Sequence, residues 1–239
     1  MIKDKLRRLL NFLHLDLTKN LEYDRLTKMV LNVVVKKDSN TIDVGCHKGE
    51  ILSILLNLAP EGKHFAFEPL PDYFRELQKK FGTKASIFPY ALSEKSGTTN
   101  FQFVRNAPAF SGIKKRMYLT DNPGVEEIQV QMMCLDEVLP SDVKIDFIKI
   151  DVEGGELAVL KGGRNLIKKF RPYIIFEFGL GSSDFYGIDG KAMFDFLNLE
   201  LEMNIATLKS FIKRGKPLSE AEFVDCFNSN SEYYFVAYP

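Results

Sequence analysis

Short apolar runs alternate along the chain with longer stretches in which apolar residues recur every three or four positions. The runs predict buried strands, because short apolar segments bounded by turn residues are typical of strands covered on both faces. The helical spacing predicts amphipathic helices. We expect strands at 41–44, 64–67, 85–88, 147–150 and 173–178, and helices at 50–58, 71–81 and 156–170. This alternation predicts an α/β fold with a doubly wound, mostly parallel sheet.

One region interrupts the alternation. The segments 98–104 and 126–133 predict two extended strands, joined by the long connection 105–124. A connection of this length is uncommon in a compact domain and is usually functional or disordered. It carries the basic run Lys114–Arg116, which leaves two interpretations open. The connection is either a lid whose cations face an anionic acceptor or a solvated loop.

The first 38 residues predict a helical extension, and we place the main domain at 39–239. Within residues 1–14, leucines lie at helical spacing among lysines and arginines. A basic amphipathic helix of this kind can lie on an anionic membrane as a peripheral contact. The favoured alternative is a helix packed on the core or on a second subunit, which leaves an oligomer open.

Composition limits the classes of function. The 239 residues, 45% of them apolar, suffice for one substantial core. Basic and acidic residues number 32 each, so no global field favours nucleic acid. Three scattered cysteines argue against a disulfide framework or zinc site and favour a reducing compartment. Without a recognisable secretory leader or an apolar span of about 20 residues, we expect a cytoplasmic protein.

The strongest motif follows the first strand. The run Asp43-Val-Gly-Cys-His-Lys-Gly49 places a carboxylate near the strand end and two glycines in the turn before a helix. Glycine lets backbone approach a ligand closely. Glu68 ends the next strand, where nucleotide-binding α/β folds place the acid that holds a ribose diol. The spacing is not G-x-G-x-x-G, so it favours S-adenosylmethionine over a nicotinamide cofactor.

A second acidic motif follows the strand at 147–150 and contains Asp151, Glu153 and Glu156. If this strand lies beside the first, Asp151 faces Asp43 across the switch point where such sheets bind ligands. Three interpretations stay open. The acids orient or deprotonate an acceptor, or they hold a divalent cation such as Mg²⁺. In the third, Glu156 only stabilises its helix N-terminus and Glu153 faces solvent. We assign no residue to a metal.

Two further groups are candidates for proton transfer. His47 lies in the cofactor turn and titrates near neutral pH, although local packing is the favoured alternative. Glu177 ends the fifth strand and faces either the acceptor or a local polar partner. For catalysis we rank Asp151 first, followed by Glu153, Glu177 and His47.

The chain resembles the FkbM family of methyltransferases over about residues 40–178, in a series of ordered blocks: Asp43–Gly49, Phe67–Pro69, Pro89–Ser93, Leu135–Asp136, Asp151–Glu156, Val159–Gly163 and Arg171–Glu177. Gly163 stands where that family is expected to have alanine. The resemblance implies a class I methyltransferase, Rossmann-like fold that uses S-adenosylmethionine to methylate a hydroxyl of a sugar, glycan or natural product.

The same resemblance implies roles for particular residues. Asp43, Gly45 and Gly49 are expected to line the methionine moiety, Glu68 to bind the ribose diol, and Ala91 and Leu92 to border the adenine. Apart from the resemblance, we expect the segments 105–124 and 179–190 to build the pocket for the acceptor, a small molecule or glycan.

We therefore predict an O-methyltransferase that depends on S-adenosylmethionine, and two alternatives remain. A nicotinamide-dependent oxidoreductase predicts G-x-G-x-x-G at residues 45–50, which the sequence lacks. A catalytically silent methyltransferase-like module for binding or assembly need not keep Asp43 and Glu68 intact.

Overall fold

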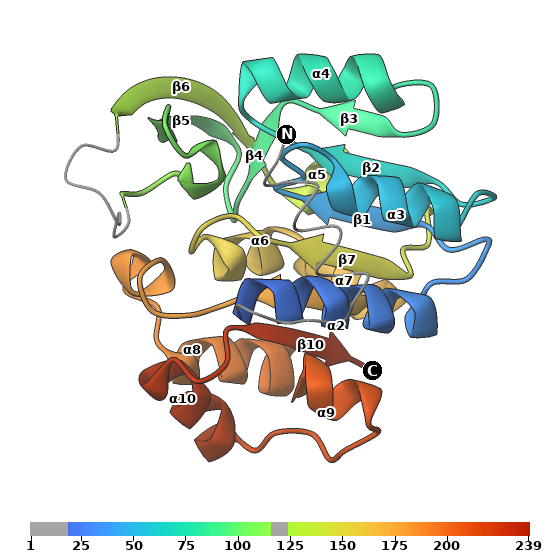
Figure 1. The fold of residues 1–239 in the computed structure, drawn as a ribbon, viewed down its shortest axis with the longest axis vertical. Helices are drawn as coiled ribbons and strands as arrows, with labels where there is room; N and C mark the ends of the chain where they lie inside the picture. The colour runs from blue at the N-terminus through green and yellow to red at the C-terminus, as the bar shows by residue number, and fades with distance from the viewer. Residues whose placement is uncertain (1–18, 116–123) are drawn as a thin grey trace.

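In a computed structural model that describes residues 19–115 and 124–239, helices cover both faces of a central sheet (Figure 1). The helix expected within residues 1–14 and part of the 105–124 connection lie outside the described residues. Seven strands form the sheet within the described ranges, in the order β3-β2-β1-β7-β8-β10-β9. Their bounds are β1 Thr41–Val44, β2 His64–Phe67, β3 Ser86–Phe88, β7 Phe147–Ile150, β8 Tyr173–Glu177, β9 Asn204–Thr207 and β10 Tyr234–Tyr238.

The first five of these strands are parallel, and β10 runs antiparallel to both of its neighbours. This arrangement confirms the doubly wound, mostly parallel sheet and places β7 beside β1 as expected. No strand is expected from the sequence beyond residue 178, so β9 and β10 are additions. Because β10 follows β9 in the chain but lies between β8 and β9, its place cannot be inferred from local patterning.

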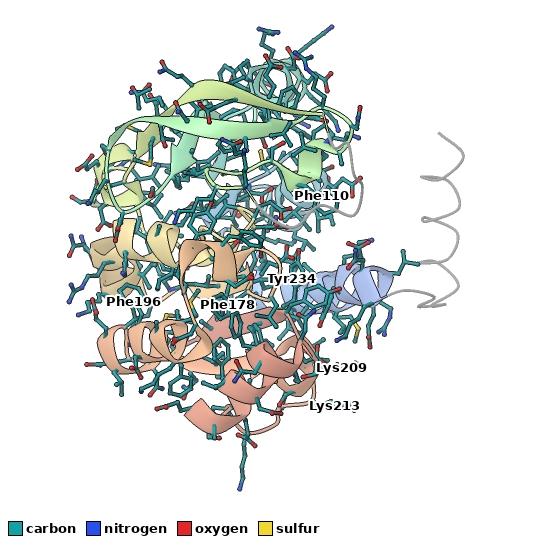
Figure 2. All side chains as sticks on the ribbon, turned by 90° about the vertical axis from the view of Figure 1, so that its left-hand side faces the viewer. Phe110, Phe178, Phe196, Lys209, Lys213 and Tyr234 are labelled. Atoms are coloured by element: carbon teal, nitrogen blue, oxygen red, sulfur yellow. The ribbon has the colours of Figure 1, made fainter. Side chains whose placement is uncertain are left out.

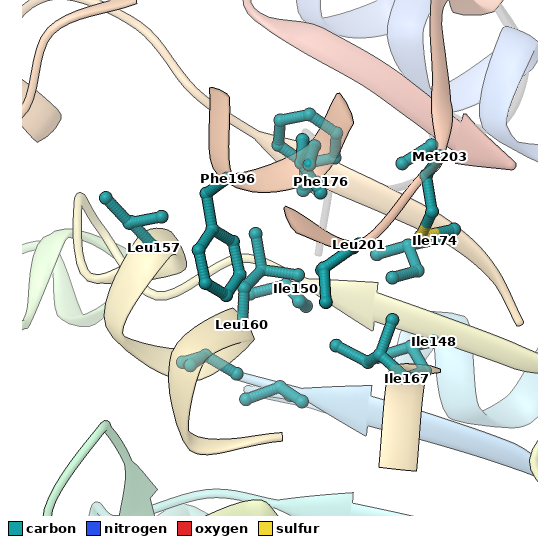
Figure 3. Packing of buried hydrophobic residues seen from close by; sticks show 14 of the residues in the cluster. Ile148, Ile150, Leu157, Leu160, Ile167, Ile174, Phe176, Phe196, Leu201 and Met203 are labelled. Atoms are coloured by element: carbon teal, nitrogen blue, oxygen red, sulfur yellow. The ribbon is translucent and has the colours of Figure 1, made fainter. Parts of the chain in front are cut away.

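Alternate residues of the strands face two different sets of helices. One face is covered by α2 Lys19–Val34, α3 Glu50–Leu58, α4 Pro71–Phe81 and α9 Leu208–Ile212. The other is covered by α5 Leu135–Val138, α6 Glu156–Gly162, α7 Arg164–Phe170, α8 Gly190–Asp195, the π-helical turn η3 Phe196–Glu200 and α10 Glu220–Ser229. On this second face, Phe196 projects toward Leu160 of α6 and Ile150 of β7 (Figure 3).

Helix α2 belongs to the packed core. Its Tyr23, Leu26 and Val30 are buried with Phe147 and Ile175 of the sheet. The turn between α2 and β1 contains the boundary that we place between residues 38 and 39. No described helix is both long and apolar enough to span a bilayer.

The single helix expected at 156–170 is wrong, because the structure has two helices separated at Gly163. The backbone of Gly163 leaves the helical region, with φ −109° and ψ 15°. A Cβ at Gly163 would lie 2.8 Å from Leu135 Cδ2, and one at Gly162 would lie 2.0 Å from the Ser93 carbonyl oxygen. Close packing against neighbouring elements therefore interrupts a helix that the local sequence pattern favours.

A second sheet lies beside the carboxyl end of β2. It contains β4 Tyr90–Leu92, β5 Gly97–Val104 and β6 Val125–Met133 in the order β4-β6-β5. These bounds confirm the strands expected at 98–104 and 126–133, and β5 pairs with β6 in antiparallel fashion. After β5, residues 108–114 fold back and pair through Gly112 with Gln102. We call residues 108–114 the strap.

Candidate active site

Two adjoining hollows lie at the carboxyl ends of β1, β2 and β7. The inner cavity has a mainly apolar lining that includes Phe67, Pro69, Leu70, Ala91, Leu92, Phe101, Pro108 and Ile113. The outer cleft is bordered by α2, the strap, β8 and the start of β10, and its lining is more polar. Five residues line both hollows, and we call them the shared wall: Gly45, His47, Ala109, Asp151 and Glu153.

The structure brings nearly all the predicted site residues to these hollows. Glu68, Ala91 and Leu92 line the inner cavity, and Asp43 and Glu177 line the outer cleft. His47, Asp151 and Glu153 stand on the shared wall. Gly49 lines neither hollow.

Glu68 is held by backbone donors at the mouth of the inner cavity. Its Oε2 accepts the His47 N–H at 2.9 Å and its Oε1 accepts the Leu70 N–H at 3.0 Å. The side chain is only 4% exposed. Burial raises the pKa of Glu68 to about 7, against the opposing effect of these two hydrogen bonds. Each carboxylate oxygen keeps a lone pair for a hydroxyl donor of a ligand.

Asp43 is a fully buried acid on the outer-cleft side. Neither of its carboxylate oxygens has a hydrogen-bond partner among the described residues, and the side chain is 0% exposed. Burial raises the pKa of Asp43 to about 6, and the charge of Lys149 on the neighbouring strand partly opposes this. A buried carboxylate without donors is costly, so this geometry fits a ligand that brings its own cationic or N–H donor.

The two glycines of the turn are required by the protein's own packing. Gly45 has φ +72°, and a Cβ there would lie 1.9 Å from the Asp151 carbonyl oxygen. Gly49 has φ +73°, and its Cβ would lie 2.6 Å from the ring of Phe81 and 2.8 Å from Leu77. Gly45 therefore lets the ends of β1 and β7 approach each other, and Gly49 lets α4 pack against the turn.

This packing gives a test with a matched control. Gly45→Ala is expected to lower the free energy of unfolding by about 3 kcal/mol, because the new Cβ collides with backbone in a left-handed conformation. Gly187 has nearly the same φ, +71°, but nothing lies within 4 Å of the position that a Cβ would take there. Gly187→Ala should therefore cost only about 1 kcal/mol. Urea unfolding measures both, and equal losses would contradict the packing role.

Asp151 is the centre of a hydrogen-bonded group on the outer-cleft side of the shared wall. Its Oδ2 accepts from Lys149 Nζ and from the Tyr234 hydroxyl, each at 2.9 Å. The Tyr234 oxygen also lies 3.2 Å from Glu177 Oε2. Tyr234 stands directly opposite Glu177 across the β8–β10 pair, so strand register places this hydroxyl between the two acids.

Lys149 and Asp151 each stabilise the charged form of the other. Burial alone would raise the pKa of Asp151, but the charge of Lys149 and hydrogen bonds from Lys149, Glu177 and Tyr234 lower it below its ordinary value. Burial alone would lower the pKa of Lys149, but Asp151 and Asp43 raise it. Lys149 thus stays protonated and Asp151 ionised. The Tyr234 hydroxyl lies within hydrogen-bond distance of both Asp151 and Glu177, so it links the two acids.

The loop after Asp151 is fixed by Glu156. This buried side chain accepts the Val152 and Gly154 N–H groups through Oε1, each at 3.1 Å. Burial raises the pKa of Glu156 to about 7. Glu153, between the two donors, has φ +59°, which is unfavourable for a residue with a Cβ. Glu156 therefore shapes the loop, whereas Glu153 stands on the shared wall in a strained conformation.

His47 also has a left-handed backbone, with φ +46°. Its ring lies 4.5 Å from the ring of Tyr73, and its Nε2 is buried with no hydrogen-bond partner among the described residues. Burial lowers the pKa of His47, so the ring is neutral at neutral pH. The ring therefore packs on Tyr73 and also borders the two hollows.

Sequence reasoning missed Lys149 and Tyr234. The signal for Lys149 was a lysine inside the buried run Phe147–Ile150, where an unpaired cation is rare. Tyr234 had no such signal, because its position depends on where β10 enters the sheet. Within the described ranges, no group of three or more histidine, cysteine or acidic side chains is placed to hold a metal ion, so the magnesium interpretation gains no support.

Comparisons with known proteins agree with this geometry. The family model for the methyltransferase FkbM domain matches residues 43–205, which is more than half of the chain. A crystal structure of methyltransferase FkbM from Methylobacillus flagellatus superposes with a TM-score of 0.51 at 16% identity, covering 85% of this chain and 44% of that one. This likeness supports the fold.

Two sequence relatives extend the comparison. The 2-O-methyltransferase NoeI of Sinorhizobium fredii is 26% identical over 161 residues, covering 60% of this chain and 65% of NoeI. The methyltransferase sdnD of Sordaria araneosa is 26% identical over 152 residues, covering 51% of this chain and 59% of sdnD. The matches thus span less than two thirds of the length of either relative.

The fold is that of a class I methyltransferase, with a Rossmann-like sheet, and it implies S-adenosylmethionine as the methyl donor. The chain belongs to the FkbM methyltransferase family.

Proposed function

We propose that this protein is an O-methyltransferase that transfers the methyl group of S-adenosylmethionine to a hydroxyl of a small-molecule or glycan acceptor. The observation that carries the proposal is the position of Asp151 on the shared wall, where it lies with Glu177 beside the polar outer cleft and directly adjoins the mainly apolar inner cavity. The relative NoeI, a 2-O-methyltransferase by name, supports an oxygen acceptor.

We assign the donor to the inner cavity and the adjoining part of the outer cleft. Ala91 and Leu92 would border the adenine, and the Glu68 carboxylate would accept both ribose hydroxyls. Asp43, which is buried without a donor among the described residues, fits the ammonium group of the methionine moiety. Gly45 would line the methionine moiety as the resemblance implies, whereas Gly49 would act through packing of the turn.

The bound donor supplies an electrophilic methyl group on a cationic sulfur. Catalysis by the chain then consists mainly of aligning the acceptor oxygen behind that methyl carbon. Transfer would form a C–O bond on the acceptor and break the C–S bond of the donor, whose electron pair would stay on sulfur. The acceptor proton passes to the Asp151–Glu177 pair, which Lys149 and Tyr234 hold in place. Glu153 and His47 are the secondary candidates, because both stand on the shared wall.

Calorimetric titration with S-adenosylmethionine and S-adenosylhomocysteine tests the donor site. We expect micromolar binding of both. Radiolabelled methyl transfer to glycans and hydroxylated natural products, with and without magnesium, then tests the reaction. Asp151→Asn should lower kcat at least about 100-fold with intact donor binding, since a positioned base contributes 10²–10⁴-fold. If neither nucleoside binds, the site serves binding or assembly instead.

We also propose a cytoplasmic location from the state of the cysteines. Cys46, Cys134 and Cys226 are all free thiols in the structure, which fits the reducing environment of the cytoplasm.

A further inference from the structure

One side of the outer cleft is built by segments that lie on either side of the family match at residues 43–205. The start of α2 contributes Asn20, Tyr23, Asp24 and Thr27, and the segment leading into β10 contributes Asn230, Tyr233 and Tyr234. We call residues 20–27 and 230–234 the acceptor wall. The acceptor wall therefore lies outside the residues that the family model matches.

The two halves of the wall are tightly joined. The Tyr23 hydroxyl donates to Glu232 Oε2 at 2.5 Å and accepts the Tyr233 N–H at 3.2 Å. The Tyr233 hydroxyl donates to Asn20 Oδ1 at 2.7 Å. The ring of Tyr23 lies 4.6 Å from that of Tyr233 and 5.0 Å from that of Tyr234, which Figure 2 shows beside α2. Such a cross-linked wall is organised before any ligand binds.

The cleft that this wall encloses is acidic. Its described lining contains six carboxylates, Asp24, Asp43, Glu50, Asp151, Glu153 and Glu177, and two lysines, Lys48 and Lys149. Lys149 is already paired with Asp151, because its Nζ lies 2.9 Å from Asp151 Oδ2. Even with a donor of single positive charge bound, the lining keeps an excess of negative charge.

The two described lysines of the basic run Lys114–Arg116 do not offset this excess of negative charge. Lys114 and Lys115 are absent from the lining of both hollows. The Lys114 N–H donates to the Tyr186 hydroxyl at 3.1 Å, and its Nζ lies 3.5 Å from the Phe185 carbonyl oxygen. Lys114 therefore fastens the strap to the 183–186 turn, and Arg116 lies outside the described residues.

We propose that the acceptor wall selects neutral or amine-bearing polyhydroxyl compounds and rejects acceptors that carry a carboxylate or phosphate beside the reacting hydroxyl. This inference rests on the proposed function and names its substrate class. Side-chain amides and carboxylates offer directional partners for hydroxyls, and tyrosines add apolar surface with a polar tip. Like charge at close range in a cleft repels an anionic acceptor, which is how binding sites exclude competitors.

Binding of three matched probes to the complex with S-adenosylhomocysteine tests the inference. The probes are methyl glucoside, methyl glucosaminide and methyl glucuronide, which differ in charge on one ring. Affinities are measured by ligand-observed NMR, and methyl transfer is measured separately. We expect the neutral and amine-bearing probes to bind at least about tenfold more tightly than the glucuronide, because one like-charge contact costs about 1.4 kcal/mol or more. Raising the salt concentration should shrink this difference.

Variants locate the effect on the wall. Asp24→Lys should reduce or reverse the discrimination, whereas Asp38→Lys, an exposed site that follows α2 and lines neither hollow, should leave it unchanged. Asp24→Asn gives the same direction with a smaller perturbation if the lysine variant does not fold. Equal binding of the glucuronide, or no binding of any probe, overturns the inference. Probe binding without methyl transfer would instead overturn the proposed reaction and leave the wall's selectivity standing.

Discussion

Glu68→Ala is expected to weaken binding of S-adenosylmethionine and S-adenosylhomocysteine by about 100-fold. The buried carboxylate is held by the His47 and Leu70 N–H groups at 2.9 and 3.0 Å, so it is fixed before a ligand arrives. Two hydrogen bonds from a ribose diol to such a charged acceptor are worth about 3 kcal/mol, which is about 100-fold in affinity. Calorimetric titration of the purified variant measures the loss.

A control separates this effect from general loss of an acid. Glu76, on the exposed side of α4, lines neither hollow, so Glu76→Ala should bind both nucleosides normally. Thermal unfolding of each variant shows whether the fold survives. Asp43→Ala should weaken binding in the same direction through the methionine ammonium. If folded Glu68→Ala protein binds within about threefold of wild type, the ribose is bound elsewhere.

Affinity for the donor is expected to rise about 1000-fold between about pH 5 and pH 8. Burial raises the pKa of Asp43 to about 6 and that of Glu68 to about 7, so the empty site holds protons in this range. Binding a cationic methionine moiety and a ribose diol requires both carboxylates to be ionised, so protons are released as the ligand binds. Titration in two buffers of different ionisation enthalpy measures that release directly.

The same groups set the sign of a stability change. In the unfolded chain these carboxyls titrate near pH 4, so between about pH 4 and 7 the empty folded protein binds more protons than the unfolded chain. Its free energy of unfolding should therefore fall as the pH rises through this window. Saturating donor should remove most of the fall. A donor affinity that does not change across this range of pH would contradict the assignment of Asp43 and Glu68.

Local patterning predicted the part of the fold that depends on local sequence. The apolar runs at 41–44, 64–67 and 147–150 and the helices at 50–58 and 71–81 have the predicted bounds. The break at Gly163 was missed because its cause is contact with Leu135, which lies far away in the sequence. The C-terminal strands were missed because their order in the sheet is decided by tertiary packing.

Some residues of the candidate site could likewise be predicted from local sequence, whereas others depend on tertiary packing. Asp43, Glu68 and Asp151 lie at or just after the ends of strands that meet, so alternation alone brought them together. The glycines were predicted for the right turn, but the space they leave is filled by Asp151, Leu77 and Phe81 rather than only by a ligand. Tyr234 could not be predicted, since its contact with Asp151 spans 83 residues and needs β10 in place.

Because β10 is the last strand to be synthesised, its position also affects how the protein folds during translation. A ribosome that has synthesised residues 43–205 has produced the whole family-matched segment, yet the edge of β8 that β10 covers is still open. An open parallel edge invites pairing with other chains. Neither the Asp151–Tyr234 contact nor the acceptor wall exists until residue 234 emerges. During translation, the donor nucleoside could therefore occupy its pocket before the cleft for its methyl acceptor has formed.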